Sequence, residues 1–233
     1  MSHLSLTSLF KIPGHMANYE VLSRASCFLL NNQIIATSQH VVAPYNFPNY
    51  YSADWVQHIT ADHVKCVAEI RDTSGQITAT FPLHRCYNHA SRDLSLLSFA
   101  SPPPPLSSHT LYPGPPFQQG LNVHCLGHTV TEPMVRRSDA DDSDDDNRVC
   151  VPGRIASVIA LQSPAQTFLY PASALVDGYC GGPVVAECGG VVGMVEGIVP
   201  LDHEVETVRG LGSYVDRDVI CKALEEYARE EWD

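Results

Sequence analysis

The chain has 233 residues, of which 44% are hydrophobic and 17% are charged, and its formal net charge at pH 7 is −12. These values exclude a disordered chain and allow either one domain or two small barrels to bury a sizeable core. With 26 acidic against 14 basic residues, the composition also argues against a surface that binds nucleic acid or an anionic membrane. No apolar window is long and uninterrupted enough to predict a membrane span.

The chain contains eight cysteines, and their spacing shows neither a CxxC pair nor a tight disulfide framework. The first 14 residues lack the charged region and the apolar stretch of a secretory signal peptide. We therefore expect mainly reduced thiols and an intracellular location, and we prefer the cytoplasm to the mitochondrion.

The first half of the chain carries short apolar runs that predict β-strands. Strands are expected at residues 27–30, 33–37, 64–70, 77–82 and 94–99. The first two flank Asn31-Asn32, a pattern typical of a hairpin, and His40 is expected where a strand ends. Residues 1–24 are assigned to an N-terminal arm and residues 25–106 to a first β-barrel.

Four consecutive prolines within residues 101–106 predict a stiff linker that ends the first barrel. Further strands are expected at residues 121–126, 153–161, 167–170, 184–185 and 191–199. Between the first two of these, six aspartates at 139–146 predict a solvated loop. Residues 107–215 are assigned to a second β-barrel and residues 216–233 to a C-terminal helix. The predicted fold class is therefore all-β, as a pair of barrels closed by one helix.

One stretch of the second unit, residues 177–183, places Cys180 between glycines and between two apolar runs. Glycine costs backbone entropy on folding, so such a cluster needs a geometric reason. One reason is a sharp turn that presents backbone N–H groups to a developing oxyanion beside a nucleophilic sulfur. The alternative is a glycine-rich turn that carries an inert, buried cysteine.

A nucleophile needs a base, and His40 and Asp93 are the candidates whose positions fit. His40 is followed by two valines that would anchor it against a core, and Asp93 precedes an apolar strand. Each also has an ordinary structural interpretation, as a hydrogen-bonded core histidine and as a strand-capping aspartate. Together with Cys180 they follow the order histidine, aspartate, nucleophile.

Three segments around these residues resemble the catalytic blocks of trypsin-like peptidases, most closely those of the HtrA/Deg branch. They are residues 37–42 (TSQHVV), 92–97 (RDLSLL) and 178–185 (GYCGGPVV). The likeness extends to residues 121–128, 153–158, 191–194 and 211–216. It implies a chymotrypsin-like fold of two six-stranded antiparallel β-barrels with a C-terminal helix.

The resemblance also implies an activity and a site. Cys180, His40 and Asp93 would form a triad that hydrolyses peptide bonds through a thioacyl intermediate, and the N–H groups of Gly178 and Cys180 would hold the oxyanion. The substrate pocket would be shaped by Ala174, Leu175, Val176, Met194, Val195 and Glu196. These are chiefly small or apolar, which suggests a small or aliphatic residue before the cleaved bond. The partner is then a protein or peptide substrate, with no cofactor, and a homo-oligomer formed through the N-terminal segment stays open.

The sequence departs from this family at one central position, because Cys180 stands where the HtrA/Deg branch carries serine. Cysteine there is similar to the viral chymotrypsin-fold cysteine proteases. Those mostly have a substrate-binding histidine after the nucleophile, whereas residues 184–200 contain none, so glutamine specificity is not implied.

Two other interpretations remain open. The first is a pseudoprotease, a trypsin-like fold that has lost activity and serves as a binding or structural subunit. The second is a structural zinc site, for which the spacing is irregular and no metal is expected. Its candidate ligands are His84, Cys86 and His89, or else His124, Cys125, His128 and Cys150.

Overall fold

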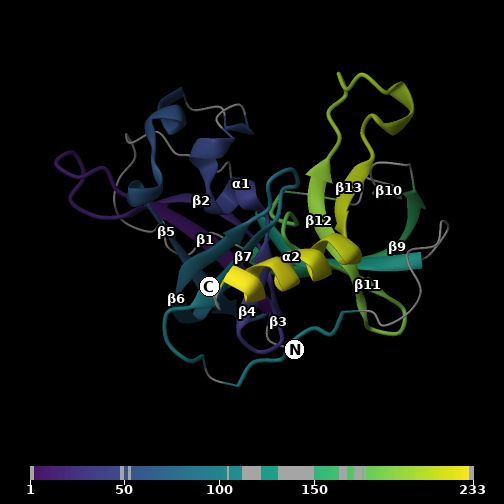
Figure 1. Ribbon diagram of the computed structural model, residues 1–233, viewed down its shortest axis with the longest axis horizontal. Coiled ribbons are helices and arrows are strands. Elements are labelled where there is room, and N and C mark those ends of the chain that lie inside the picture. Colours follow the sequence, from purple (N-terminus) through teal and green to yellow (C-terminus); the bar gives the residue numbers. More distant parts are fainter. Residues whose placement is uncertain are drawn as a thin grey trace.

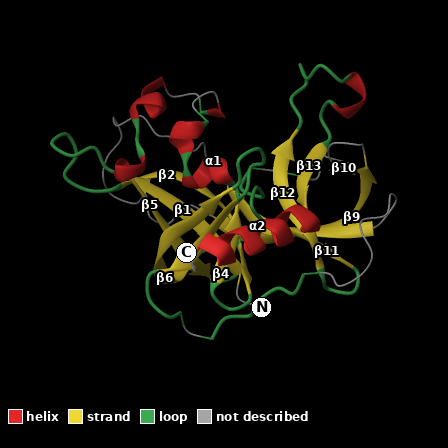
Figure 2. Cartoon of the chain, in the orientation of Figure 1, coloured by secondary structure: helices red, strands yellow, loops and turns green. Residues whose placement is uncertain are grey.

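The computed structural model describes residues 3–47, 50–51, 54–103, 105–111, 122–130, 150–162, 167–170, 175 and 177–230. Within these ranges the chain forms two antiparallel β-sheets that lie side by side (Figure 1). A helix near the end of the chain packs against strands of both sheets (Figure 2).

The first sheet has seven strands in the spatial order β2-β1-β5-β6-β7-β4-β3. Their bounds are β1 His3–Phe10, β2 Glu20–Ser26, β3 Phe28–Leu30, β4 Ile34–Thr37, β5 Val64–Arg71, β6 Ile77–Asn88 and β7 Ser95–Phe99. The edge strands β2 and β3 are consecutive in the chain and are separated only by Cys27. The sheet therefore curls into a half-barrel, whose two edges come together at one bent stretch of chain.

The second sheet is a closed barrel of six strands in the order β10-β13-β12-β11-β8-β9. Their bounds are β8 Asn122–Val130, β9 Cys150–Gln162, β10 Thr167–Tyr170, β11 Pro183–Ala186, β12 Val191–Ile198 and β13 Gly212–Asp216. Helix α2, Arg217–Glu230, follows β13 directly. The expected all-β, two-barrel fold with a closing helix is confirmed. The second barrel has the six strands expected, whereas the first unit is a seven-stranded half-barrel instead of a six-stranded barrel.

The N-terminal segment differs from its prediction as an arm over residues 1–24. Within it, β1 pairs with β2 on one side and with β5 on the other, so it lies inside the first sheet. Leu4 and Leu6 of β1 are buried in the core, and the intervening Ser5 is buried as well. Because both faces of β1 are covered, its small polar residues do not mark it as exposed chain.

The hairpin predicted around Asn31-Asn32 is present, since β3 pairs with β4 across these residues. Asn31 has φ of 40° and Asn32 has φ of 66°, a left-handed conformation that asparagine tolerates better than most residues. His40 lies shortly after the end of a strand, because β4 ends at Thr37. A single helical turn, α1 Gln39–Val42, follows β4, and His40 lies on it.

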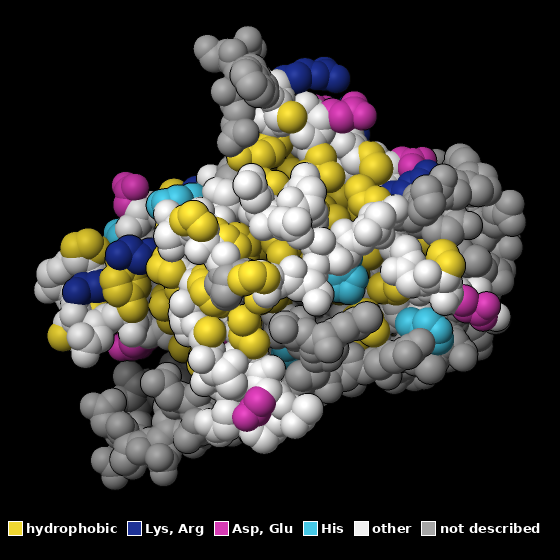
Figure 3. Space-filling model, turned by 90° about the horizontal axis from the view of Figure 1, so that it is seen from below, with side chains coloured by type: hydrophobic (Ala, Val, Ile, Leu, Met, Phe, Trp, Pro, Cys, Tyr) yellow, Lys and Arg dark blue, Asp and Glu magenta, His cyan; other side chains and the backbone are white. Residues whose placement is uncertain are grey.

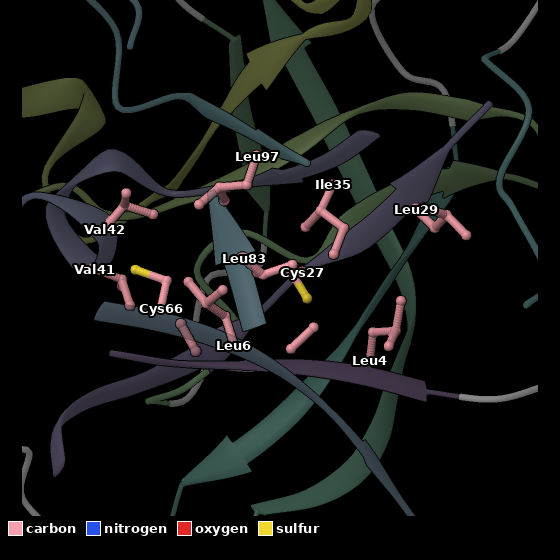
Figure 4. Close-up of a cluster of buried hydrophobic side chains, with 12 residues drawn as sticks. Leu4, Leu6, Cys27, Leu29, Ile35, Val41, Val42, Cys66, Leu83 and Leu97 are labelled. Carbon is pink, nitrogen blue, oxygen red and sulfur yellow. The ribbon is translucent and has the colours of Figure 1, made fainter. Parts of the chain in front are cut away.

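The first barrel encloses its own hydrophobic core. Leu6, Ile35 and Leu97 come to it from three different strands and lie together in Figure 4. Val41 and Val42 of α1 belong to the same core. Their burial therefore anchors the turn that follows β4 against the inside of the barrel.

A further core lies between the two barrels and helix α2. It includes Phe28 and Leu94 from the first half of the chain, Met194 and Val215 from the second barrel, and Ile220 from α2. Burying each such large side chain contributes about 1.5–3 kcal/mol. The barrels are therefore joined by a continuous apolar interface.

Among the described residues, no helix is both long and apolar enough to cross a membrane. On the face drawn in Figure 3, the coloured charged side chains lie mainly toward the edges of the view, some of them in adjacent groups, and hydrophobic and uncharged surface lies between these groups.

Candidate active site

The backbone of His40, on helical turn α1, is held by the packing of its neighbours and by a hydrogen bond from Tyr51. Its side chain is only 1% exposed, and the two valines that follow it in the chain are fully buried. The hydroxyl of the buried Tyr51 donates a hydrogen bond of 2.7 Å to the His40 carbonyl oxygen. The imidazole thus projects from a backbone that packing and hydrogen bonding immobilise.

Asp93 contacts His40 at two points. Its Oδ2 lies 2.6 Å from His40 Nδ1, and its Oδ1 accepts a hydrogen bond of 2.8 Å from the His40 backbone N–H. A carboxylate at Nδ1 holds the hydrogen on that nitrogen and turns Nε2 the other way. Nε2 is buried and forms no hydrogen bond with any described residue.

The surroundings change the proton affinity of His40. Burial lowers its pKa, whereas interaction with the Asp93 and Cys180 side chains raises it, and the net result is a rise from 6.5 to about 9. The imidazole therefore holds a proton at neutral pH. A charged imidazole in a buried place requires a negative partner, and the Asp93 carboxylate is in contact with it.

Cys180 is a partly exposed free thiol on the turn that precedes β11. Two glycines shape this turn, since Gly178 has φ of 97° and Gly181 has φ of 82°, a region that side chains rarely adopt. A Cβ at Gly178 would lie 2.4 Å from the carbonyl oxygen of His128, so the turn also approaches β8 too closely for any side chain.

The backbone of this turn leaves N–H groups available beside the thiol. Among the described residues, the N–H groups of Gly178 and Cys180 donate no hydrogen bond. The carbonyl groups of the same residues are both engaged, by the Ser26 hydroxyl at 2.6 Å and by the Ser26 N–H at 3.0 Å, respectively. The turn therefore has the features expected of an oxyanion-binding loop.

Glu196 of β12 has a different environment from the pocket wall predicted for it. It forms an ion pair with Arg92 at 3.1 Å and accepts a hydrogen bond of 3.3 Å from the Asp93 N–H. The hydroxyl of Ser213 also donates to it at 3.2 Å. Glu196 thus links the second barrel to the turn that carries Asp93, a contact that no local sequence pattern indicates.

The other residues predicted for the substrate pocket are not gathered on an open surface. Leu175, Met194 and Val195 are buried, and they belong to the hydrophobic cores. Ala174 and Val176 lie outside the described residues. The described residues of the predicted substrate pocket are thus three buried side chains and Glu196, which is paired with Arg92.

Tyr50 covers the site and was not singled out in the sequence. Its ring stacks on the His40 imidazole, with 4.1 Å between ring centroids and an interplanar angle of 29°. Its hydroxyl oxygen lies 3.9 Å from Cys180 Sγ. Tyr50 is 50% exposed, so one face of its ring closes over the histidine while the rest meets solvent.

Groups of three or more His, Cys, Asp or Glu side chains that could hold a metal ion do not occur in the part of the chain that the structure describes. The side chains of Cys86 and Cys150, which the zinc interpretation uses, fall outside that part.

The arrangement joins a carboxylate, an imidazole with a raised pKa, a thiol and a glycine-rich turn with available N–H groups. A thiol beside a histidine can act as a nucleophile toward a carbonyl carbon, and the histidine can carry the proton. The two N–H groups can stabilise negative charge on the carbonyl oxygen.

Comparison with known proteins gives two findings. A profile of the trypsin-like peptidase domain matches residues 25–194. Among solved structures, the chain is similar to the crystal structure of the serine endoprotease from Yersinia pestis, with a TM-score of 0.58 and 13% sequence identity. That alignment covers 97% of this chain and 63% of the other, and at this identity it supports the fold alone. No curated protein sequence gives a significant match.

Proposed function

The chain belongs to the trypsin-like peptidase family, and from that membership we propose that it is an endopeptidase with Cys180 as its nucleophile, His40 as its proton carrier and Asp93 as the residue that orients His40. The substrate is a protein or peptide. The observation that carries this proposal is the two-point contact of Asp93 with His40, because it fixes the tautomer and the direction of Nε2.

In the proposed reaction, the proton of the Cys180 thiol resides on His40 Nε2 and the sulfur attacks the carbonyl carbon of the peptide bond. A C–S bond forms, and the carbonyl π-electrons move to the oxygen. When the oxyanion collapses, the C–N bond breaks, and Nε2 gives its proton to the leaving amine. Water then attacks the thioester and gives a proton to Nε2. The C–S bond breaks, the acid product leaves, and the starting state returns with the sulfur as a thiolate and the proton on His40 Nε2.

The proposed oxyanion donors are the N–H groups of Gly178 and Cys180. Loss of one such donor in an acyl-transfer enzyme costs on the order of 3–4 kcal/mol of transition-state stabilisation. Because these donors belong to the backbone, the conformation of the turn decides whether they converge on one point.

Labelling with iodoacetamide tests the proposal, with peptide hydrolysis measured on the same samples. We expect Cys180 to react faster than Cys188, an exposed free thiol that serves as the internal reference. In His40→Ala the Cys180 rate should fall to that of the reference, and peptide hydrolysis should stop. Cys180→Ala should lose hydrolysis and the fast-labelling site.

The same experiment distinguishes the pseudoprotease. If Cys180 labels no faster than Cys188 and a peptide library stays intact, the chain is a trypsin-like fold without peptidase activity. If the library is cut, the residue before the cleaved bond tests the proposed preference for small or aliphatic side chains.

The proposal also covers the cellular location of the protein and its similarity to one branch of the family. We place the protein inside the cell, with the cytoplasm preferred, and the free thiols of the cysteines with described side chains support a reducing compartment. The likeness of its three catalytic blocks supports a place near the HtrA/Deg branch. Fractionation of the native host, with detection by antibody, tests the location.

A further inference from the structure

Ser26 lies in the first barrel, but its hydrogen bonds lead to the turn that carries Cys180. It is the last residue of β2 and is buried, with 1% of its surface exposed. Its hydroxyl donates to the Gly178 carbonyl oxygen at 2.6 Å and accepts from the His128 N–H at 2.8 Å. Its own N–H donates to the Cys180 carbonyl oxygen at 3.0 Å.

The carbonyl groups of the four residues 177–180 are all held by hydrogen bonds. Asp177 accepts from the Val130 N–H at 2.9 Å, and Tyr179 accepts from the Gly182 N–H at 2.9 Å. The other two carbonyls, those of residues 178 and 180, are held by Ser26. Among the described residues, the Ser26 hydroxyl is the one side-chain group that takes part.

Holding these carbonyl groups determines where the N–H groups of the turn point. In a planar trans peptide the C=O and the N–H point in opposite directions. The peptides that contain the Gly178 and Cys180 N–H groups are fixed by their own carbonyl groups. The peptide after Gly178 is fixed by the Ser26 hydroxyl. The peptide after Cys180 is fixed by the Ser26 N–H and also by the Gly181 N–H, which donates to the Val195 carbonyl oxygen at 2.8 Å. Ser26 therefore limits rotation about the Cα of both residues that supply the proposed oxyanion donors.

The glycines of the second barrel leave room for this serine. A Cβ at Gly127 would lie 2.8 Å from Ser26 Oγ, and one at Gly181 would lie 2.3 Å from the Ser26 carbonyl oxygen. A Cβ at Gly182 would lie 3.1 Å from Ser26 Cβ. Ser26 is thus one of the groups that leave no space for a side chain at these positions, together with Tyr179 at Gly127 and the Leu126 carbonyl oxygen at Gly182.

We propose that Ser26 is a positioning residue for the proposed oxyanion donors, an inference that rests on the proposed peptidase function. It does not touch the substrate. Its hydroxyl fixes the peptide that follows Gly178. Its backbone N–H, which Ser26→Ala and Ser26→Cys both keep, holds the peptide that follows Cys180, so that both N–H groups face the same carbonyl oxygen. The first barrel thereby sets the geometry of an oxyanion site that belongs wholly to the second barrel.

The test compares Ser26→Ala and Ser26→Cys with wild type in three assays: peptide hydrolysis, binding of a peptide aldehyde and alkylation by iodoacetamide. Hydrolysis and the aldehyde adduct both place negative charge in the oxyanion site, whereas alkylation does not. We expect kcat to fall about ten- to a hundredfold with KM nearly unchanged, as for loss of a transition-state interaction. Aldehyde affinity should fall in parallel, and Cys180 alkylation should keep its wild-type rate.

Ser8→Ala is the matched control, because it also removes a buried serine hydroxyl that donates to a backbone carbonyl in the first sheet. It should leave all three assays unchanged. Rates are expressed per folded protein, measured by circular dichroism and size-exclusion chromatography, and Ser26→Cys carries the test if Ser26→Ala does not fold.

Two results would overturn the inference. One is an unchanged kcat in folded Ser26 variants. The other is an equal loss of alkylation and hydrolysis, which indicates a general structural role. If wild-type protein shows neither hydrolysis nor fast labelling of Cys180, the proposed function has failed instead.

Discussion

The contact between Asp93 and His40 predicts how activity depends on pH. Burial lowers the pKa of His40, Asp93 and Cys180 raise it, and the result is about 9. If the leaving amine takes its proton from His40, kcat/KM should fall as pH rises through about 9, because the imidazole then has no proton to give. A neutral histidine acting as a base would produce the opposite trend, with activity rising through the same range.

The variant Asp93→Asn removes the carboxylate and leaves the burial. We expect it to lower the pKa of His40 well below 9. The fall of kcat/KM at high pH should then begin at a lower pH than in the wild type. The difference between 6.5 and about 9 corresponds to about 3 kcal/mol of preference for the charged imidazole. Loss of a charge-assisted hydrogen bond of about 1.5–3 kcal/mol should also lower kcat about ten- to a hundredfold.

The assay is a pH profile of kcat/KM with a fluorogenic peptide, accompanied by NMR titration of the His40 ring. Asp62→Asn controls for the change in net charge, because it removes an exposed carboxylate that is not among the described contacts of His40. Its profile should match that of the wild type. An alkaline limb that stays in place in Asp93→Asn would refute the assignment of this limb to His40.

Three further predictions follow from the same contacts. The raised pKa of His40 stabilises the folded state below pH 6.5, and this stabilisation should be lost as pH rises through about 9, which denaturant unfolding at several pH values measures. Tyr50→Ala should speed alkylation of Cys180 about two- to tenfold, the worth of one aromatic stacking contact, while Tyr50→Phe should change it little because the ring remains. Gly178→Ala should destabilise the protein by about 2–4 kcal/mol, because it combines a positive φ with a clash against β8. Gly189→Ala, with a similar φ and open space, should cost only about 1 kcal/mol in the same unfolding assay.

Much of the fold could be predicted from local patterns. The paired asparagines and the short apolar runs indicated the hairpin and the many strands, and the glycine turn with its cysteine indicated a special backbone. The strand β1 was missed because its second buried face consists of small polar residues such as Ser5 and Thr7, which are more typical of exposed chain. The single turn α1 was missed because four residues are too few to show a helical period.

The supporting contacts of the site could not be predicted, and distance along the chain is the reason. Ser26 and Gly178 are joined by a hydrogen bond between residues 152 positions apart, and Arg92 and Glu196 by one between residues 104 positions apart. Neither pair has a local signature. A buried serine at the end of a strand is ordinary in sequence, and its role emerges only when the second barrel lies against the first.

The apolar interface shared by both barrels and α2 has a consequence for how the protein is made. Because Leu94, Met194 and Ile220 share one core, the two halves are expected to unfold in a single cooperative transition. During synthesis His40 and Asp93 leave the ribosome long before the thiol that they serve. The turn that carries Cys180 gains its hydrogen bonds with Ser26 only when the second barrel lies against the first. In the proposed peptidase, the site would therefore be incomplete until synthesis of the chain is nearly finished.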